Sequence, residues 1–252
     1  GIITAAVLRL HRKPLAYVTA MVGLKDLKNS LYLLNRLQNE TNTGVEAFEF
    51  MPRRYIERYL EKKEGALEPF DRPHEINILV EVATTRVSDL EQDHSGTPKL
   101  RSIVEEALSD MIKDGSAQDA VIAQNEAQRR VMWERREAAA EITLGIPGSI
   151  DTDVAVPLDD VSKFLEQVSV RVKEIDPNGE ELYISHLGDG NLHYNFYPSD
   201  TSGALKEPII KVIEDVVLGL NGSFSAEHGI GLSKKNSMSR RKDPIALEMM
   251  SA

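Results

Sequence analysis

The spacing of apolar residues changes repeatedly over the first third of the chain. Residues 15–22 are almost continuously apolar, which is typical of a buried strand, and residues 24–39 repeat leucine at helical spacing. Residues 45–51 again have the composition of a strand, and residues 74–82 alternate apolar with polar positions, which predicts another. These segments predict a βαβ-like unit followed by a further strand.

The middle of the chain has the pattern of helices. A polar linker with glycine and proline at residues 89–99 precedes apolar positions that start at Leu100 and lie on one helical face. Gly115 is placed to end this helix, and residues 116–142 predict a second helical stretch. We therefore expect an all-helical insertion over about residues 100–145.

Strand-like alternation returns in the last part of the chain. Residues 153–157 predict a strand, residues 159–173 a helix, and residues 182–197 two further strands. A helix over about residues 208–220 leads into a glycine-rich segment, residues 221–231. Two β-α-β halves around an insertion predict an α+β fold, in which ferredoxin-like β-α-β units form an antiparallel sheet covered by helices.

The composition excludes several classes of function. A formal net charge of −10 disfavours nucleic acid or an anionic membrane as a partner, because both need a concentrated positive surface. The absence of cysteine excludes disulfides, iron–sulfur clusters and thiol nucleophiles, so any metal must be bound by His, Asp or Glu. The apolar runs are short and no signal peptide is evident, so we expect a cytoplasmic protein without membrane insertion.

The candidate chemistry lies on a predicted hairpin. An Asp-Gly pair at residues 189–190 separates two strand-like runs, which is a strong signal for a tight turn. If this pair forms the turn, His186 faces His193 and Ile184 faces Asn195. Directly opposed side chains on one face of a sheet have Cβ atoms about 5 Å apart, so both imidazoles could bind one ion.

A third metal ligand is expected outside the hairpin. Catalytic zinc sites usually have three protein ligands and one open position, and two histidines with one carboxylate are a common set. Glu227, which precedes His228, is the candidate because Gly222, Gly229 and Gly231 free the backbone around it. Glu227 is a chemically compatible ligand, but the sequence alone does not show that residues 222–231 lie beside the hairpin.

Other interpretations of these residues stay open. Histidines on strands are often hydrogen-bonded structural residues. The Asp-Gly-Asn run at residues 189–191 resembles part of a calcium loop, but the spaced oxygen ligands and the terminal glutamate of an EF-hand are missing. The Gly188-x-Gly190 and Gly229-x-Gly231 fragments lack the full dinucleotide fingerprint.

Two long motifs resemble the C-terminal domain of FAD-linked oxidases. They are HLGDGNLHYN at residues 186–195 and GSFSAEHGIG at residues 222–231. The family includes D-lactate dehydrogenase, D-2-hydroxyglutarate dehydrogenase and the FAD subunit of glycolate oxidase. Residues 15–252 resemble this domain, and residues 1–14 resemble the end of the family's flavin-binding domain or a linker. We therefore expect a fragment of a longer enzyme, inactive alone.

The resemblance implies an activity and its cofactors. His186, His193 and Glu227 would hold a divalent metal, usually zinc. FAD would be bound mainly by the N-terminal domain of the same parent chain and would accept a hydride from a D-2-hydroxy acid such as D-lactate or glycolate, giving the 2-oxo acid. A separate, unknown electron acceptor would reoxidise the flavin, and a homodimer is compatible with this arrangement.

The resemblance also implies residues for substrate binding and catalysis. Asn195 and Arg136 would contact the substrate, and His228 would act as the base. A guanidinium is a planar fork that suits a carboxylate. Because Met132 and Trp133 are the i−4 and i−3 neighbours of Arg136, we expect this arginine near the buried side of its helix.

Two positions differ from members specific for 2-hydroxyglutarate. In those members a Lys stands two positions before the Asp of an Asp-Val-x-Val-Pro motif, whereas this chain has Asp151 there, two positions before Asp153. Those members also have a Thr four positions after the Arg that corresponds to Arg136, whereas this chain has Ala140. A second substrate carboxylate would lose both partners here, which disfavours a dicarboxylic substrate.

Two other functions fit the same residues. A non-enzymatic ferredoxin-like module for ligand binding or subunit assembly would use the histidines structurally. A metal-dependent hydrolase would use the His, His and Glu set without flavin.

Overall fold

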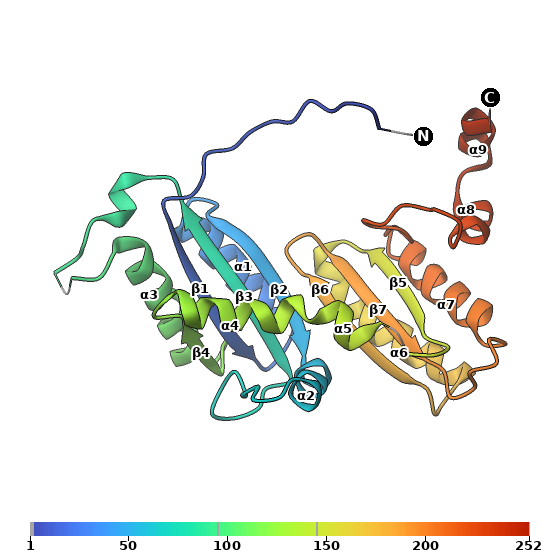
Figure 1. Ribbon diagram of the computed structural model, residues 1–252, viewed down its shortest axis with the longest axis horizontal. Helices are drawn as coiled ribbons and strands as arrows, with labels where there is room; N and C mark the ends of the chain where they lie inside the picture. Colours follow the sequence, from blue (N-terminus) through green and yellow to red (C-terminus); the bar gives the residue numbers. More distant parts are fainter. Residues whose placement is uncertain (1–2, 95, 145, 252) are drawn as a thin grey trace.

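The computed structural model describes residues 3–94, 96–144 and 146–251, which form one seven-stranded antiparallel sheet. Its strand order is β4-β1-β3-β2-β6-β7-β5 (Figure 1). The predicted α+β fold with an antiparallel sheet is therefore confirmed. Residues 3–14 form no helix or strand, and within the described ranges no helix is long and apolar enough to cross a membrane.

The first half of the sheet is a ferredoxin-like unit in which β1 pairs with both β3 and β4, and β2 pairs with β3. Its elements are β1 (Ala16–Leu24), α1 (Lys28–Glu40), β2 (Val45–Pro52), α2 (Arg53–Lys62), β3 (Ile76–Thr84), α3 (Lys99–Lys113) and β4 (Asp119–Ile122). The helices α4 (Glu126–Glu137) and α5 (Ala139–Thr143) connect this unit to the second half.

The second half repeats the same order of elements but does not complete it. It contains β5 (Ile150–Ala155), α6 (Val161–Ile175), β6 (Glu180–His186), β7 (Asn191–Tyr197) and α7 (Lys206–Gly219), and continues into α8 (Lys235–Arg241) and α9 (Pro244–Ser251). Where the first half has β4 beside β1, the second half has a single bridge between Ala155 and Ser223 beside β5. The segment after α7 thus follows the sheet edge only briefly.

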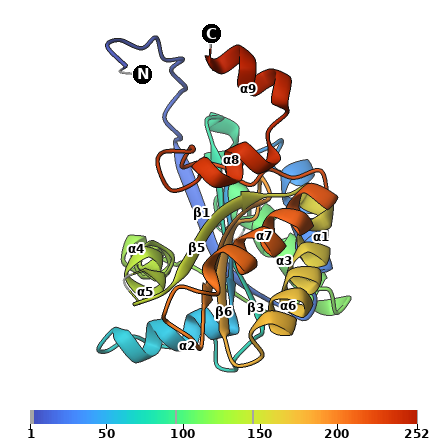
Figure 2. The same cartoon turned by 90° about the vertical axis from the view of Figure 1, so that its right-hand side faces the viewer.

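The two halves join edge to edge through β2 and β6. Glu49 pairs with His186, and Phe50 pairs with Ser185, in an antiparallel register. Helices cover both faces: α1, α3, α6 and α7 lie on one face, and α2, α4 and α5 lie on the other (Figure 2). Residues that alternate along β2 and β6 therefore face two different apolar cores.

The prediction of an all-helical insertion is wrong in part. The expected helix over residues 116–142 is interrupted by β4, which pairs with β1 from Gly23 to Ala20. Four residues are too few to produce a recognisable alternation, and their strand conformation depends on hydrogen bonds to a partner distant in sequence. Of the helices in the predicted range, α3 lies on the first face of the sheet, and α4 and α5 lie on the second face together with α2.

A buried carboxylate attaches α4 to the sheet. Glu81 on β3 is 5% exposed and accepts hydrogen bonds from Arg129 Nε at 2.7 Å and Nη2 at 2.8 Å. It also accepts from Trp133 Nε1 at 2.9 Å and from the Thr19 hydroxyl at 2.6 Å. Burial alone would raise the pKa of Glu81, but these hydrogen bonds outweigh it and hold the pKa below its ordinary value.

We expect Glu81→Gln to reduce the free energy of unfolding by about 2 to 3 kcal/mol at pH 7, because it removes the charge of a buried acid that accepts two hydrogen bonds from the partly buried Arg129 guanidinium. Since the folded pKa of Glu81 lies below 4.5, its contribution is complete above that pH and is lost as the pH falls through the folded pKa. The difference between variant and wild type should therefore shrink in urea unfolding below pH 4.5.

Glu126→Gln is the matched control, since Glu126 also pairs with Arg129, at 3.0 Å, but its side chain is exposed. Exposed pairs contribute about 0.2 to 1 kcal/mol. Equal losses in the two variants would contradict the structural role of Glu81.

Candidate metal and substrate site

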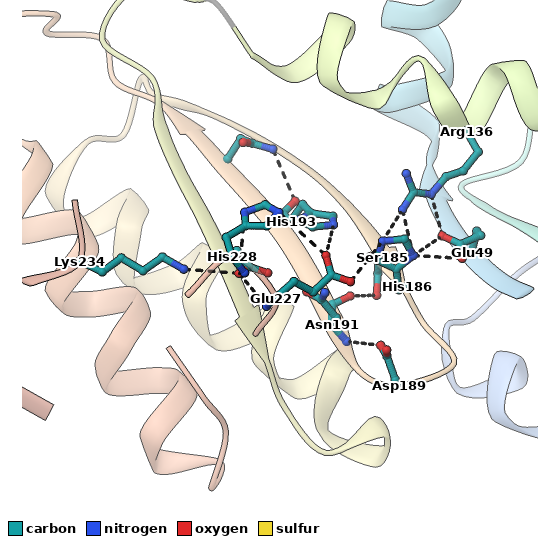
Figure 3. Close-up of polar contacts among 12 residues, drawn as sticks. Glu49, Arg136, Ser185, His186, Asp189, Asn191, His193, Glu227, His228 and Lys234 are labelled. Atoms are coloured by element: carbon teal, nitrogen blue, oxygen red, sulfur yellow. Dashed lines mark hydrogen bonds and ion pairs between the residues drawn. The ribbon is translucent and has the colours of Figure 1, made fainter. Parts of the chain in front are cut away.

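The three predicted metal ligands lie together in the structure. One ligand atom each from His186, His193 and Glu227 lies within 4.8 Å of the others. The Glu227 carboxylate is 3.8 Å from His186 Nε2 and 3.9 Å from His193 Nε2, and the two ring centroids are 5.3 Å apart (Figure 3). Ligands at tetrahedral angles around zinc would be about 3.4 Å apart, so a small side-chain adjustment would bring them into coordination.

The register of the hairpin differs from the prediction by two residues. His186 pairs with Asn191, and His193 pairs with Ile184, because the loop contains residues 187–190 rather than a two-residue turn. The predicted direct opposition of the two histidines is therefore wrong. A shift of two residues keeps every side chain on its face, so both imidazoles still point to the same side of the sheet as diagonal neighbours.

The position of Gly190 explains the longer loop. The Gly190 carbonyl accepts a hydrogen bond from Val156 N at 3.1 Å, which holds the loop against the chain after β5. Gly190 has φ +76°, and a Cβ there would lie 2.1 Å from the Val156 carbonyl oxygen. Only glycine fits this contact, and it comes from tertiary packing that a local turn signal does not contain.

The incomplete edge of the second half brings Glu227 to the hairpin. Ser223 exchanges two backbone hydrogen bonds with Ala155, and Ala226 N donates to the Asp153 carbonyl at 3.1 Å. The Asp153 carboxylate then accepts from the backbone N–H groups of Glu227 and His228, both at 2.9 Å. Burial alone would raise the pKa of Asp153, but these two N–H groups outweigh it and lower the pKa.

A second buried acid, Glu49, contacts the other side of the histidine pair. Its carboxylate lies 2.9 Å from His186 Nδ1 and accepts from Arg136 Nε at 2.7 Å. Glu49 and Arg136 are each 7% exposed, so the expectation that Arg136 lies near the buried side of its helix is confirmed. Arg136 Nη2 is 3.3 Å from the His186 ring.

The two imidazoles have different electrostatic environments. The hydrogen bond with Glu49 raises the pKa of His186, despite partial burial. Burial lowers the pKa of His193, and the nearby His186 and Arg136 lower it further. His193 is therefore the more readily neutral of the two ligands, while His186 is paired to an acid.

A cleft of about 450 Å³ opens beside the histidines. Arg136, His193, Asn195 and His228 line it together with Asp151. The His228 side chain is 65% exposed, and its ring stacks on His193 with centroids 5.7 Å apart. Asn195 is buried and donates through Nδ2 to the Leu182 carbonyl at 3.3 Å. The rest of the cleft wall is mixed: its apolar residues include Ala139, Ala140, Leu144, Ile184 and Ile230, and its polar residues include Thr143, Thr152, Asp153, Ser233 and Lys234.

Residues 13–252 match the family model described as FAD linked oxidases, C-terminal domain. The chain belongs to this family. The resemblance inferred from the two motifs is therefore confirmed, and membership implies FAD as the cofactor of the enzymes that contain such domains.

Curated relatives of this FAD-linked oxidase domain are dehydrogenases. D-2-hydroxyglutarate dehydrogenase of Stutzerimonas stutzeri is 26% identical over the whole chain, which covers 52% of that protein. A Schizosaccharomyces pombe protein provisionally named as a mitochondrial D-lactate dehydrogenase is 29% identical over 99% of the chain and 47% of its own length. The chain thus spans about half the length of these relatives. Some carry mitochondrial names, so a cytoplasmic location stays a prediction.

The fold of the FAD-linked oxidase domain also occurs in a distant solved structure. p-Cresol methylhydroxylase with substrate bound superposes with a TM-score of 0.55 over 94% of this chain and 49% of that one. At 9% sequence identity the similarity supports the fold alone.

The residues of this FAD-linked oxidase domain fit a divalent cation. Two imidazoles and a carboxylate are donors that zinc prefers. Beside them, the Asn191 amide and Asp153 Oδ1 are buried without a hydrogen-bond partner among the described residues, and such groups are normally satisfied by protein, water or an ion. Asn191 pairs with His186 across the hairpin, so the unsatisfied amide belongs to the same face.

Sequence reasoning gave no role to Glu49 or Asp153. Glu49 had a visible signal, because it stands between Phe48 and Phe50 in an otherwise apolar strand, where an acid must be paired to be buried. Asp153 appeared only as the first residue of the Asp-Val-x-Val-Pro motif, and its contact with the backbone of Glu227 is set by tertiary structure.

Proposed function

We propose that this chain is the substrate- and metal-binding half of a flavin-dependent dehydrogenase that oxidises a D-2-hydroxy acid to the 2-oxo acid. The convergence of His186, His193 and Glu227 beside a cleft that Arg136 and His228 also line carries this proposal. In the proposed domain organisation, residues 15–252 form the substrate domain, and residues 1–14 belong to the connection with a flavin-binding domain in the same parent chain.

The proposed chemistry divides between the bound groups and the side chains. When bound, a divalent cation would polarise the substrate's hydroxyl and carboxylate oxygens, and FAD would accept the hydride equivalent lost from Cα. Arg136 orients the substrate carboxylate: its Nε is engaged by Glu49, whereas Nη1 has no hydrogen-bond partner among the described residues and can donate to the substrate. Asn195 adds a polar contact on the cleft floor.

His228 takes the hydroxyl proton in this mechanism. Its ring lines the cleft beside His193, and its backbone N–H is fixed by Asp153 at 2.9 Å. The ring nitrogens themselves lie 3.9 Å from Asp153 Oδ2 and Glu227 Oε2, too far for hydrogen bonds. The imidazole is therefore held in place while its nitrogen stays available to accept a proton.

The proposed substrate carries a single carboxylate. Asp151 is the cross-strand partner of Asn195 where β5 pairs with β7, and it lines the cleft with the apolar side chains of Ala140 and Leu144. A second carboxylate at this end would meet an acid and apolar surface, which is unfavourable for both charge and solvation. The naming of several relatives as 2-hydroxyglutarate dehydrogenases therefore need not extend to this chain.

Metal analysis of the chain purified without chelator tests the site. We expect wild-type protein and the exposed-histidine control His11→Ala to hold about one equivalent of a divalent metal, and His186→Ala to lose it, because one ligand of three is removed. Equal metal content in all three proteins would refute the ligand set.

The role of His228 requires a protein that joins this chain to its flavin-binding domain. We expect His228→Ala to lower kcat by about 100- to 10,000-fold, the usual contribution of a general base, while the metal content stays at the wild-type level. His186→Ala is the comparison, since it should lose both activity and metal. Undiminished turnover in His228→Ala would remove His228 from the mechanism, and a parent protein without flavin would favour the non-enzymatic module.

Asp151→Lys in the same flavin-containing protein should change the substrate specificity. The ratio of kcat/KM for a 2-hydroxy dicarboxylate to that for D-lactate should rise by about tenfold or more, because a repulsive contact becomes an attractive one. Asp159→Lys, with the same change of charge on an exposed residue that does not line the cleft, should leave the ratio unchanged. A wild-type preference for the dicarboxylate would show that the proposed class is wrong.

A further inference from the structure

Glu49 occupies a position that neither the metal ligands nor the substrate contacts explain. It lies on β2, in the first half of the sheet, whereas His186 and His193 lie on the second half. It is the residue directly opposite His186 where β2 and β6 join. Its side chain is buried on the face that α4 covers, where an unpaired carboxylate would be strongly unfavourable.

The two oxygens of this carboxylate contact two functional side chains. Glu49 Oε1 is hydrogen-bonded to His186 Nδ1 at 3.1 Å, and Oε2 accepts from Arg136 Nε at 2.7 Å (Figure 3). An ionised carboxylate can only accept hydrogen bonds, so Nδ1 of a neutral His186 must carry the proton. The lone pair then lies on Nε2, the nitrogen that faces Glu227 at 3.8 Å.

We propose that Glu49 is a positioning residue that fixes the Nδ1–H form of His186 and binds Arg136 to the same carboxylate, so that the metal ligand and the substrate clamp are oriented as one unit. This inference rests on the proposed function. Carboxylates that accept the second N–H of a metal-binding imidazole fix its orientation and raise its basicity.

A purely stabilising role explains the arrangement less well. Replacing a buried ion pair by apolar side chains is often neutral or stabilising, and Met51, which shares the face of Glu49 on β2, belongs to an apolar core. The shared carboxylate instead has a geometric effect: it joins the second half of the sheet, through His186, to α4, through Arg136.

Glu49→Gln is the informative variant because it preserves shape but changes the pattern of donors. The amide oxygen can still accept from Arg136 Nε, but the amide NH₂ then donates to His186 Nδ1. This arrangement favours the Nε2–H form, which cannot bind a metal through Nε2. An acid-to-amide change beside a catalytic imidazole is known to trap the wrong tautomer in this way.

The experiment combines two measurements on the purified chain. Long-range ¹H–¹⁵N spectra of metal-free protein at pH 9 report the tautomer of His186, and titration with Zn²⁺ at pH 8 reports affinity. We expect Nδ1–H in the wild type, a shift toward Nε2–H in Glu49→Gln, and an affinity about 10- to 100-fold weaker in the variant. Glu46→Gln is the matched control, since Glu46 lies on β2 and lines the same cavity as His186, but its side chain is exposed.

Each result decides a separate point. Wild-type binding of Zn²⁺ with unchanged tautomer and affinity in Glu49→Gln would overturn the role of Glu49 and leave the proposed metal site intact. Equal weakening in Glu46→Gln would assign the effect to net charge and would also overturn it. Failure of the wild type to bind Zn²⁺ would refute the metal site and this inference together. An Nε2–H tautomer in wild-type protein would overturn the inference even if Glu49→Gln does not fold.

Discussion

The edge-to-edge pairing of β2 with β6 is the constraint on which the site depends. It makes one continuous sheet from two ferredoxin-like halves, and it sets Glu49 directly opposite His186. Because alternate residues of a strand face opposite sides, this register also decides that the acid and the imidazole share the face beneath α4. A shift of one residue would turn Glu49 into the opposite apolar core and separate Arg136 from the histidines.

Buried charge on this face is balanced locally rather than by solvent. Glu49 is paired with Arg136 and His186, and Asp153 Oδ2 accepts from two backbone N–H groups and from Lys234 Nζ at 3.4 Å. Each acid positions a different part of the site. Glu49 orients the side chains of His186 and Arg136, whereas Asp153 holds the backbone of the segment after α7. A net charge of −10 for the chain is compatible with an anion in the cleft, because the cationic side chains of Arg136 and Lys234 line it.

The sequence predicted the features that depend on local pattern and missed those that depend on contacts between distant segments. The spacing of apolar residues predicted the location of most helices and strands. The two-residue period of a strand also placed both histidines on one face of the sheet, although the predicted register was wrong. The register itself depends on Gly190 packing against Val156, which lies on another segment. The partners Glu49 and His186 are 137 positions apart, and nothing local to either residue indicates the other. The four residues of β4 gain strand structure only by pairing with β1.

The missing fourth strand of the second half explains how a carboxylate reaches two histidines on a sheet. A complete strand beside β5 would commit its N–H groups to the ladder and would turn alternate side chains to opposite faces. Here the segment bonds to β5 at Ser223 and Ala226 and then leaves the edge, so the next two N–H groups are free to bind the Asp153 side chain. Glu227 can therefore turn toward the two histidines while His228 turns toward the cleft beside them, whereas residues adjacent in a regular strand would point to opposite faces. The loss of regular sheet structure at this edge is thus what allows the proposed metal ligand and the proposed proton acceptor to be consecutive in sequence.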